Sequence, residues 1–290
     1  MLESKVGKKL SRWQDLLNKE SEYMIKKIKL KGARNTRVVP SFETADGKKV
    51  KEGIFIRSGK LNKVNDKKRE AFLKEYNVTK VIDFRTDVEV HEAKDFSYPS
   101  NIKYIHLPLL NKAFFGVTHE KKMSKILFKE SKRMKYKDIE PGYMTEMYKS
   151  IVFDPYSESK FKEFFEIILN HDEGAILYHC NGGKDRTGIT TLFILTLLGV
   201  KEEDILKDFA MSNYFNRHYN RSRILLMTLF LFFLPKYTRI LTSMLYAKRI
   251  YLENMIAAIN DKYGSLMNYL KDVIGITDEM IDQLKQKYLE

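Results

Sequence analysis

The chain has 290 residues and carries a net charge of +14 at pH 7, with 43% hydrophobic and 31% charged residues. This composition is typical of an ordered globular protein and excludes a disordered or low-complexity chain. The positive charge favours anionic partners such as nucleic acid, phosphorylated ligands or an acidic membrane surface. The single cysteine excludes an internal disulfide and a cysteine-rich zinc cluster, and it favours a reducing compartment.

The first segment, residues 1–31, is predicted to be an N-terminal amphipathic helical segment outside the main domain. Its apolar residues at helical spacing among lysines are Leu10, Trp13, Leu16 and Leu17. The segment is charged from Glu3 onward and lacks the apolar region of a secretory signal. We therefore expect a cytoplasmic location, and unconventional export stays open as an alternative.

Short apolar and β-branched runs predict strands, and longer apolar runs predict helices. The predicted strands are residues 79–84, 102–107 and 174–179. The predicted helices are residues 161–169 and 188–198, a stripe that begins at Ser265, and a final helix near Asp278. The dipeptide Asp46-Gly47 lies between two short alternating runs and is the strongest hairpin signal.

The order of elements over residues 174–198 indicates an α/β architecture. An apolar strand is followed by a tight loop and by a helix that is apolar on nearly every side, which is half of a βαβ unit. Gly199 stands where a residue of left-handed conformation would end that helix.

The loop between this strand and this helix carries the clearest chemical signal. It reads His179-Cys180-Asn181-Gly182-Gly183-Lys184-Asp185-Arg186-Thr187-Gly188, and we call it the motif loop. The two glycines permit a tightly curled backbone, so its N–H groups can converge on one anion at the positive end of the helix dipole. Arg186 would complete the enclosure with a two-pronged hydrogen bond to phosphate oxygens.

Cys180 is the candidate nucleophile of this loop. A helix N-terminus and nearby Arg and Lys side chains stabilise a thiolate, and a thiolate beside an anion-binding loop is suited to attack on phosphorus. The alternative is that Cys180 is a small buried hydrophobic residue, as lone cysteines usually are. The complete ten-residue string favours the catalytic interpretation.

The string has the HCx5R signature of cysteine-dependent phosphatases, and the form HCxxGKDRTG resembles the bacterial tyrosine/serine phosphatase family, of which some members also hydrolyse phosphoinositides. Other blocks of this family are similar to residues 35–37, 45–47, 56–61, 81–85 with Glu89, 208–213 and 263–270. The resemblance spans roughly residues 32–290. It departs after Arg37, where Val38-Val39-Pro40-Ser41 replaces the family's Asp-Leu-Gly-Gly.

The resemblance implies a cysteine-phosphatase fold: an α/β domain over residues 32–290 with a mostly parallel central sheet flanked by helices, a lid-like helical insertion at about 214–248 and a helical C-terminus. It also implies a metal-independent phosphomonoester hydrolase without a cofactor. The implied partners are phosphotyrosine or phosphoserine proteins, with phosphoinositides as a further class. A catalytically inactive module that binds phosphate or anionic lipid is the alternative. No nucleic-acid partner is expected, because the sequence has no helix-turn-helix, zinc or RNA-binding signature.

The resemblance also implies a role for each residue of the motif loop. Cys180 attacks phosphorus, Arg186 and the loop amides stabilise the charge, and Thr187 donates a hydrogen bond to the departing thiolate. His179 either helps to hold the thiolate or is a core histidine. The expected substrate-binding residues are His179, Asn181, Gly182, Gly183 and Lys184.

Two carboxylates are candidates for the general acid. Asp185 precedes the arginine, the spacing found in myotubularin-type lipid phosphatases, and it is favoured. Asp83 ends a predicted strand in the family's second block, and its alternative role is to pair with Arg85 or Arg57 and hold the loop. Lys184 suits a substrate with more than one phosphate, or else it pairs with Asp185 or Asp83.

Two further segments have open roles. The run 121–137 contains eight Lys or Arg residues and one acid, Glu130, and it is either a solvated helix face or a docking surface for anionic lipid. The apolar run 224–234 is flanked by basic residues, and as a helix it is too short to cross a bilayer. It is therefore a core helix, a lid over the catalytic cleft or a membrane contact.

Overall fold

The computed structural model describes residues 28–111, 117–118, 139–230 and 235–290. Most of the predicted N-terminal helical segment and the whole of the basic run 121–137 lie outside these residues, so both remain predictions. Within the described part, no helix combines the length and the apolar character needed to cross a membrane.

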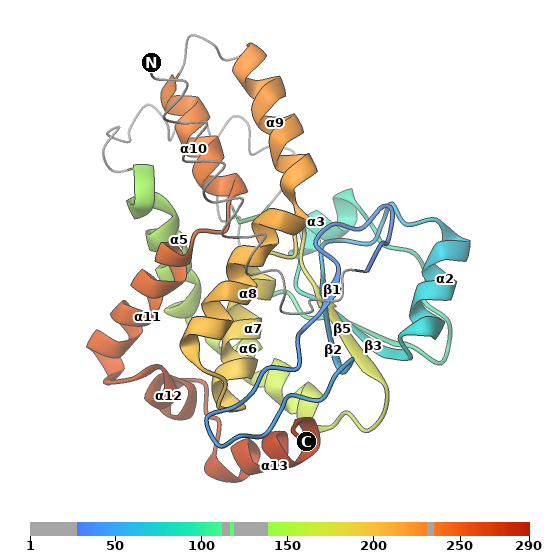
Figure 1. The fold of residues 1–290 in the computed structure, drawn as a ribbon, viewed down its shortest axis with the longest axis vertical. Helices are drawn as coiled ribbons and strands as arrows, with labels where there is room; N and C mark the ends of the chain where they lie inside the picture. The colour runs from blue at the N-terminus through green and yellow to red at the C-terminus, as the bar shows by residue number, and fades with distance from the viewer. Residues whose placement is uncertain (1–27, 112–116, 119–138, 231–234) are drawn as a thin grey trace.

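A five-stranded sheet forms the centre of the fold, in the order β1-β2-β5-β3-β4 (Figure 1). Its strands are β1 (Arg37–Val38), β2 (Phe55–Ser58), β3 (Val78–Asp83), β4 (Lys103–His106) and β5 (Ala175–His179). The pair β1–β2 is antiparallel and the other three pairs are parallel. The predicted strands at 79–84, 102–107 and 174–179 are present, and each end differs by no more than one residue.

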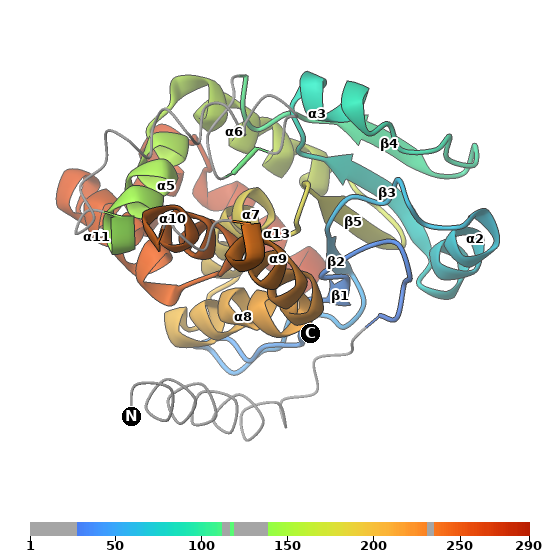
Figure 2. The ribbon, with the colours of Figure 1, turned by 90° about the horizontal axis from the view of Figure 1, so that it is seen from above.

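Helices cover both faces of this sheet. Figure 2 shows α2 (Asp66–Glu75) on one side, and α6 (Pro155–Leu169), α7 (Asp185–Leu197) and α13 (Asp278–Tyr288) on the other. The remaining elements are α3 (Asp87–Glu92), π-helical η2 (Ile139–Tyr143), α5 (Met144–Val152), α8 (Glu202–Phe215), α9 (Arg217–Phe230), α10 (Pro235–Leu245), α11 (Arg249–Tyr263), α12 (Leu266–Asn268) and π-helical η3 (Tyr269–Val273). The predicted α/β class, with a mostly parallel sheet, flanking helices and a helical C-terminus, is confirmed.

The central strand β5 is apolar along its length because it is buried on two faces. Ile176 and Tyr178 belong to the larger core, whereas Ala175 and Leu177 belong to the smaller core on the other face. Side chains alternate between the faces of a strand. A strand covered on both sides therefore needs a continuous apolar run, and this run was the sequence signal.

Helix α7 begins at Asp185, inside the motif loop and three residues before the predicted start at Gly188. All of its residues except Thr196 are buried. The hydroxyls of Thr190 and Thr191 donate to backbone carbonyls one turn earlier, at 3.0 and 2.7 Å, so these polar groups cost little in the core. Gly199 follows the helix with φ +85°, as predicted.

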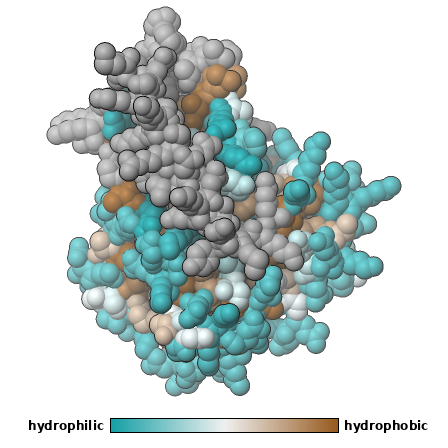
Figure 3. Space-filling view, viewed as in Figure 1, coloured by the Kyte–Doolittle hydropathy of each residue, from teal (hydrophilic) through white to brown (hydrophobic). Residues whose placement is uncertain are grey.

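Helices α9 and α10 stand together at one end of the molecule, away from the sheet (Figure 1). They occupy most of the predicted insertion. Leu225 and Leu226 are 64% and 46% exposed, so the core-helix interpretation is wrong for these two residues. A hydrophobic patch lies over α9 in the space-filling view (Figure 3). The side chains of residues 227–230 and all of residues 231–234 lie outside the described part.

Candidate active site

The motif loop joins the C-terminus of β5 to the N-terminus of α7, at the edge of the sheet where ligands of α/β proteins bind. Only one of its two central glycines is required by the geometry. Gly183 has φ +63°, and a Cβ there would lie 2.5 Å from the backbone carbon of Ser58. A Cβ on Gly182 would meet nothing within 4 Å.

The carbonyl groups of the motif loop are bonded to neighbouring segments. Gly183 O accepts hydrogen bonds from Asn35 Nδ2 at 2.6 Å and from Arg57 Nη2 at 3.1 Å. Asn181 O accepts one from the backbone N–H of Lys60 at 3.1 Å. In contrast, the N–H groups of residues 181–187 donate to no atom of the described residues. The loop therefore presents a set of unpaired backbone donors, the arrangement that binds an anion.

Arg186 is fully buried and is held by Glu89 in α3. Its Nη1 and Nη2 donate to the two carboxylate oxygens of Glu89 at 2.6 and 3.0 Å, and further to Phe84 O and Val117 O. Its Nε is buried and has no hydrogen-bond partner among the described residues. Burial opposes the charge, but Glu89 and Cys180 outweigh it and raise the pKa of Arg186 above its usual value. The guanidinium thus stays charged and keeps only Nε for a ligand, so the two-pronged hydrogen bond to phosphate expected from the sequence is not available in this arrangement of the described residues.

Glu89 was not recognised as a site residue from the sequence. Its carboxylate also accepts a hydrogen bond from Asn181 Nδ2 at 3.3 Å and one from the N–H of Thr86 at 3.0 Å. The Thr86 hydroxyl in turn accepts from the N–H of Glu89, which completes a capping box at the start of α3. The spacing Thr86-x-x-Glu89 was the signal that could have placed this carboxylate at a helix start beside the loop.

Cys180 is the free cysteine and is 2% exposed. Burial alone fits both a nucleophile and a small hydrophobic residue. The surroundings are polar, however, because Cys180 lies close enough to Arg186 to raise the pKa of the Arg186 guanidinium. The hydroxyl of Thr187 is also buried, and no described residue hydrogen-bonds to it. Such unpaired buried groups are rare in proteins, and functional sites are one of their accepted explanations.

Asp83, the second candidate for the general acid, is fully buried at the end of β3. Arg85 Nε and Nη2 donate to its two oxygens at 2.9 and 2.6 Å, and the Tyr104 hydroxyl donates at 3.0 Å. Burial opposes ionisation, but His179 and Arg85 prevail and hold the pKa of Asp83 well below its usual range. The pairing with Arg85 is the alternative role considered for this residue; Arg57 instead pairs with Asp208.

Three buried residues behind the motif loop could in principle hold a metal ion, because Asp83, Asp95 and His179 offer atoms within 4.8 Å of one another. Arg85 donates to both carboxylates, at 2.6 Å to Asp83 and 2.8 Å to Asp95, and so supplies their positive charge. His179 Nδ1 lies 3.3 Å from Cys180 O, within hydrogen-bonding distance. The group therefore fits an ion-pair network that braces the backbone at Cys180.

Asp185 and Lys184 pair with each other at the start of α7. Lys184 Nζ lies 3.2 Å from Asp185 Oδ1, and it also donates to the backbone carbonyl of Met244 at the end of α10. The hydroxyl of Tyr148 in α5 donates to Asp185 Oδ1 at 2.5 Å. Lys184 thus has the intraprotein partner that the sequence left open, and Tyr148 is a neighbour that no motif signalled.

A buried triad anchors the other side of the motif loop. Asp208 in α8 accepts a hydrogen bond from Arg37 Nε at 3.1 Å and another from Arg57 Nη1. Burial and the neighbouring Arg57 lower the pKa of Arg37 to about 10. Because Arg57 also bonds to Gly183 O, the triad connects α8 and the first two strands to the loop. The family blocks included Arg37, Arg57 and Asp208. The sequence indicated a role only for Arg57, as an alternative partner of Asp83, and did not indicate its pairing with Asp208.

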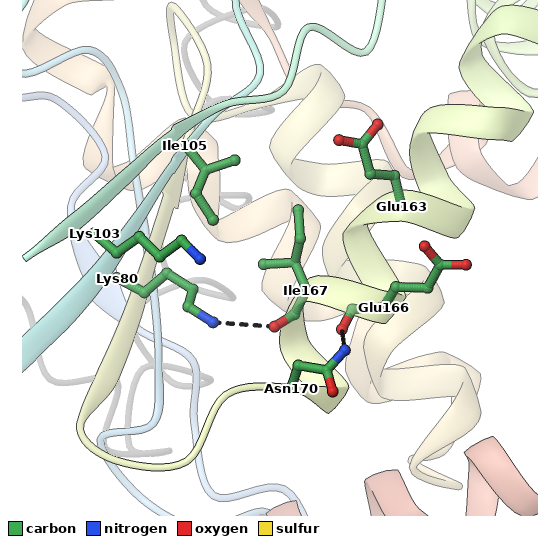
Figure 4. Close-up of a pocket in the computed structure, with 7 residues that line it drawn as sticks. All are labelled: Lys80, Lys103, Ile105, Glu163, Glu166, Ile167 and Asn170. Carbon is green, nitrogen blue, oxygen red and sulfur yellow. Dashed lines mark hydrogen bonds between the residues drawn. The ribbon is translucent and has the colours of Figure 1, made fainter.

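A separate cavity lies between α6 and strands β3 and β4 (Figure 4). Lys80 Nζ donates there to the carbonyl of Ile167 at 3.1 Å, and Asn170 Nδ2 donates to the carbonyl of Glu166 at 2.9 Å. No residue of the motif loop lines this cavity. It is not part of the candidate active site.

The chain is similar to known proteins over most of its length. A family model described as the tyrosine phosphatase family matches residues 28–290. A candidate tyrosine-protein phosphatase of Cupriavidus necator is 26% identical over 259 residues, which cover 88% of this chain and 85% of the relative. The triple specificity protein phosphatase PtpB of Mycobacterium tuberculosis is 26% identical over 276 residues, covering 88% and 96%.

Among solved structures, P. aeruginosa TpbA is similar with a TM-score of 0.27 and 15% identity, over 59% of this chain and 79% of TpbA. The family match carries the assignment, since it extends from the first described residue to the end of the chain. The protein belongs to the tyrosine phosphatase family.

Proposed function

We propose that the protein is a metal-independent phosphomonoester hydrolase that forms a phosphocysteine intermediate on Cys180. The observation that carries this proposal is the combination of unpaired donors around the cysteine. The N–H groups of residues 181–187, Nε of Arg186 and the hydroxyl of Thr187 have no partners among the described residues. A phosphate group supplies acceptors of the right charge for this set.

The first step transfers the phosphoryl group to Cys180. The sulfur anion attacks phosphorus, an S–P bond forms, and the P–O bond breaks with its electron pair on the leaving oxygen. Asp185 gives a proton to that oxygen. The loop amides and Arg186 stabilise charge on the other phosphate oxygens, and they are already held in place by Asn35, Arg57 and Glu89.

The second step hydrolyses the phosphocysteine. A water molecule attacks phosphorus and loses a proton to the Asp185 carboxylate, the P–S bond breaks, and Cys180 returns as an anion while inorganic phosphate leaves. Thr187 donates its unpaired hydroxyl to the departing sulfur. His179 positions the loop through its contact with Cys180 O.

Asp185 is the general acid in this proposal, and Asp83 is a positioning residue. Asp83 is held ionised by His179 and Arg85, so it has no proton to give near neutral pH. Its oxygens are also occupied by Arg85 and Tyr104. Asp185 lies in the loop itself, one residue before Arg186, where a leaving group would be reached.

We propose phosphotyrosine and phosphoserine proteins as substrates, with phosphoinositides as a second class. Membership of the tyrosine phosphatase family supports the first class. The second is supported by PtpB, whose name describes triple specificity. Lys184 gives less support to a substrate with several phosphates than the sequence indicated, because it is engaged by Asp185 and Met244. A panel of phosphopeptides and phosphoinositides on the pure protein separates the classes.

The exposed apolar residues of α9 support a contact with an anionic membrane surface. Leu225 and Leu226 are exposed, and the preceding turn carries the exposed cations Arg221 and Arg223. Apolar side chains flanked by cations suit the interface of an anionic bilayer. The fraction of protein that co-sediments with vesicles should rise with their content of anionic lipid. A fraction that does not change with this content would refute the contact. A reducing compartment such as the cytoplasm suits an unprotected Cys180.

Turnover of an aryl phosphate in the presence of EDTA tests the central proposal. We expect the wild type to remain active with the chelator and Cys180→Ser to lose activity. Loss of wild-type activity with EDTA would indicate a metal enzyme. Absence of turnover in both proteins would instead favour a catalytically inactive phosphate- or lipid-binding module.

A further inference from the structure

Tyr148 contacts the candidate general acid from a helix outside the motif loop. It lies in α5, is 0% exposed, and donates its hydroxyl to Asp185 Oδ1 at 2.5 Å. Its aromatic ring packs edge-on against Phe209, with ring centres 6.2 Å apart, and in a tilted arrangement against Tyr251, with ring centres 6.0 Å apart. These contacts fix the ring, so the hydroxyl has a defined position relative to the carboxylate.

The two oxygens of Asp185 have different surroundings. Oδ1 is approached by the Tyr148 hydroxyl and, at 3.2 Å, by Lys184 Nζ. Oδ2 makes no hydrogen bond to any described atom, and it is not among the fully enclosed polar atoms of this part of the chain. The carboxyl group is therefore held through one oxygen, and the other remains available to carry a proton.

We propose that Tyr148 is a positioning residue for the reaction, which holds Asp185 so that Oδ2 delivers its proton to the leaving group. This inference rests on the proposed function of Asp185. When the proton leaves Oδ2, a negative charge forms on the carboxylate, and the hydrogen bond from Tyr148 to Oδ1 strengthens. The bond thus stabilises the transition state more than the ground state, which is the condition for a contribution to the rate.

Tyr148 itself keeps its proton. Burial and the neighbouring charge of Asp185 raise the pKa of Tyr148 well above its ordinary value. The phenol is therefore a hydrogen-bond donor and not the proton source. Lys184, which forms an ion pair with Oδ1, also donates a hydrogen bond to the carbonyl of Met244, so the end of α10 is connected to the same carboxylate.

The test compares substrates with good and poor leaving groups, using kcat/KM because it reports the steps up to phosphocysteine formation. In Tyr148→Phe we expect kcat/KM for phenyl phosphate to fall roughly tenfold, in line with the loss of one hydrogen bond to a charged group. For 4-nitrophenyl phosphate, which needs less protonation, the value should stay within about twofold.

Tyr288→Phe is the matched control. Its hydroxyl is buried and donates to the carbonyl of Ile168 at 2.5 Å, and Tyr288 lies in α13 outside the site. In this variant any change in kcat/KM relative to wild type should be the same for both substrates, although a comparable hydrogen bond is lost. Thermal unfolding of both variants checks that they are folded. Should Tyr148→Phe not fold, Lys184→Met removes the ion pair with Oδ1 and should show the same leaving-group pattern.

A double-mutant cycle with Asp185→Asn separates this inference from the proposed function. We expect Asp185→Asn to lower kcat/KM for phenyl phosphate more than for 4-nitrophenyl phosphate. Adding Tyr148→Phe to Asp185→Asn should lower kcat/KM little further. If Asp185→Asn slows both substrates equally, Asp185 is not the acid and the proposed mechanism fails. If Asp185→Asn shows the pattern but Tyr148→Phe slows both substrates equally or neither, the role of Tyr148 is refuted.

Discussion

Gly183 and Gly182 are neighbours with different constraints. An alanine at 183 would have to adopt a positive φ and would place its Cβ against the backbone at the end of β2. We expect Gly183→Ala to lower kcat/KM at least tenfold, because the loop carbonyls and amides would have to move. Gly182→Ala, which meets nothing within 4 Å, should change it by less than about threefold. Equal losses in the two variants would contradict the geometry of the loop.

Glu89 tests how Arg186 is held. In Glu89→Gln the side chain can still cap α3, since Gln also serves at this position of a capping box. The ion pair with Arg186 is lost, so the guanidinium is no longer fixed by a charged partner. We expect kcat/KM to fall roughly 10- to 100-fold, together with a loss of about 3–5 kcal/mol in unfolding free energy, because Arg186 is left buried without its charged partner. A large loss of stability with normal specific activity would show that Glu89 has only a structural role.

At the scale of elements, Asp208 joins α8 to β1 and β2. Removing one partner of a buried ion pair costs about 3–5 kcal/mol, so Asp208→Asn should reduce the free energy of unfolding by that amount at pH 7. Burial raises the pKa of Asp208, but Arg37 and Arg57 prevail and lower it below its usual value. The stabilisation by Asp208 is therefore present above the pKa of the unfolded chain and is lost as pH falls through the lower folded-state value.

Urea denaturation at two pH values checks this sign. The difference in unfolding free energy between wild type and Asp208→Asn should be full at pH 7 and should shrink below about pH 4, where the unfolded carboxyl becomes protonated. A difference that is unchanged between pH 7 and pH 3 would mean that the charge of Asp208 does not contribute.

The elements that the sequence predicted correctly are those with one dominant local signal. The run at 174–179 is apolar throughout because both faces of β5 are covered. The helix after it ends at Leu197, shortly before Gly199, whose positive φ does not continue a helix. The start of α7 was placed too late, at Gly188. Asp185, Arg186 and Thr187 are polar, and only their tertiary contacts explain why a helix buries them.

On the scale of the whole molecule, the residues around the motif loop come from distant segments. Tyr148 lies 37 positions from Asp185, and Glu89 lies 97 positions from Arg186. At these separations no sequence spacing indicates that the two members of either pair are in contact. A single sequence therefore identifies the loop but not the side chains that hold it. The exposure of Leu225 and Leu226 was equally inaccessible, because an apolar run has the same pattern in a core helix and in a projecting one.

The chemical identity of the intermediate tests the account most directly. Wild-type protein is mixed with an aryl phosphate, quenched rapidly in acid and digested, and the peptide that contains residue 180 is analysed by mass spectrometry. We predict one phosphate on Cys180 during turnover and none in Cys180→Ser. Phosphate on another residue, or steady turnover by the Cys180→Ser variant, would contradict a mechanism through phosphocysteine.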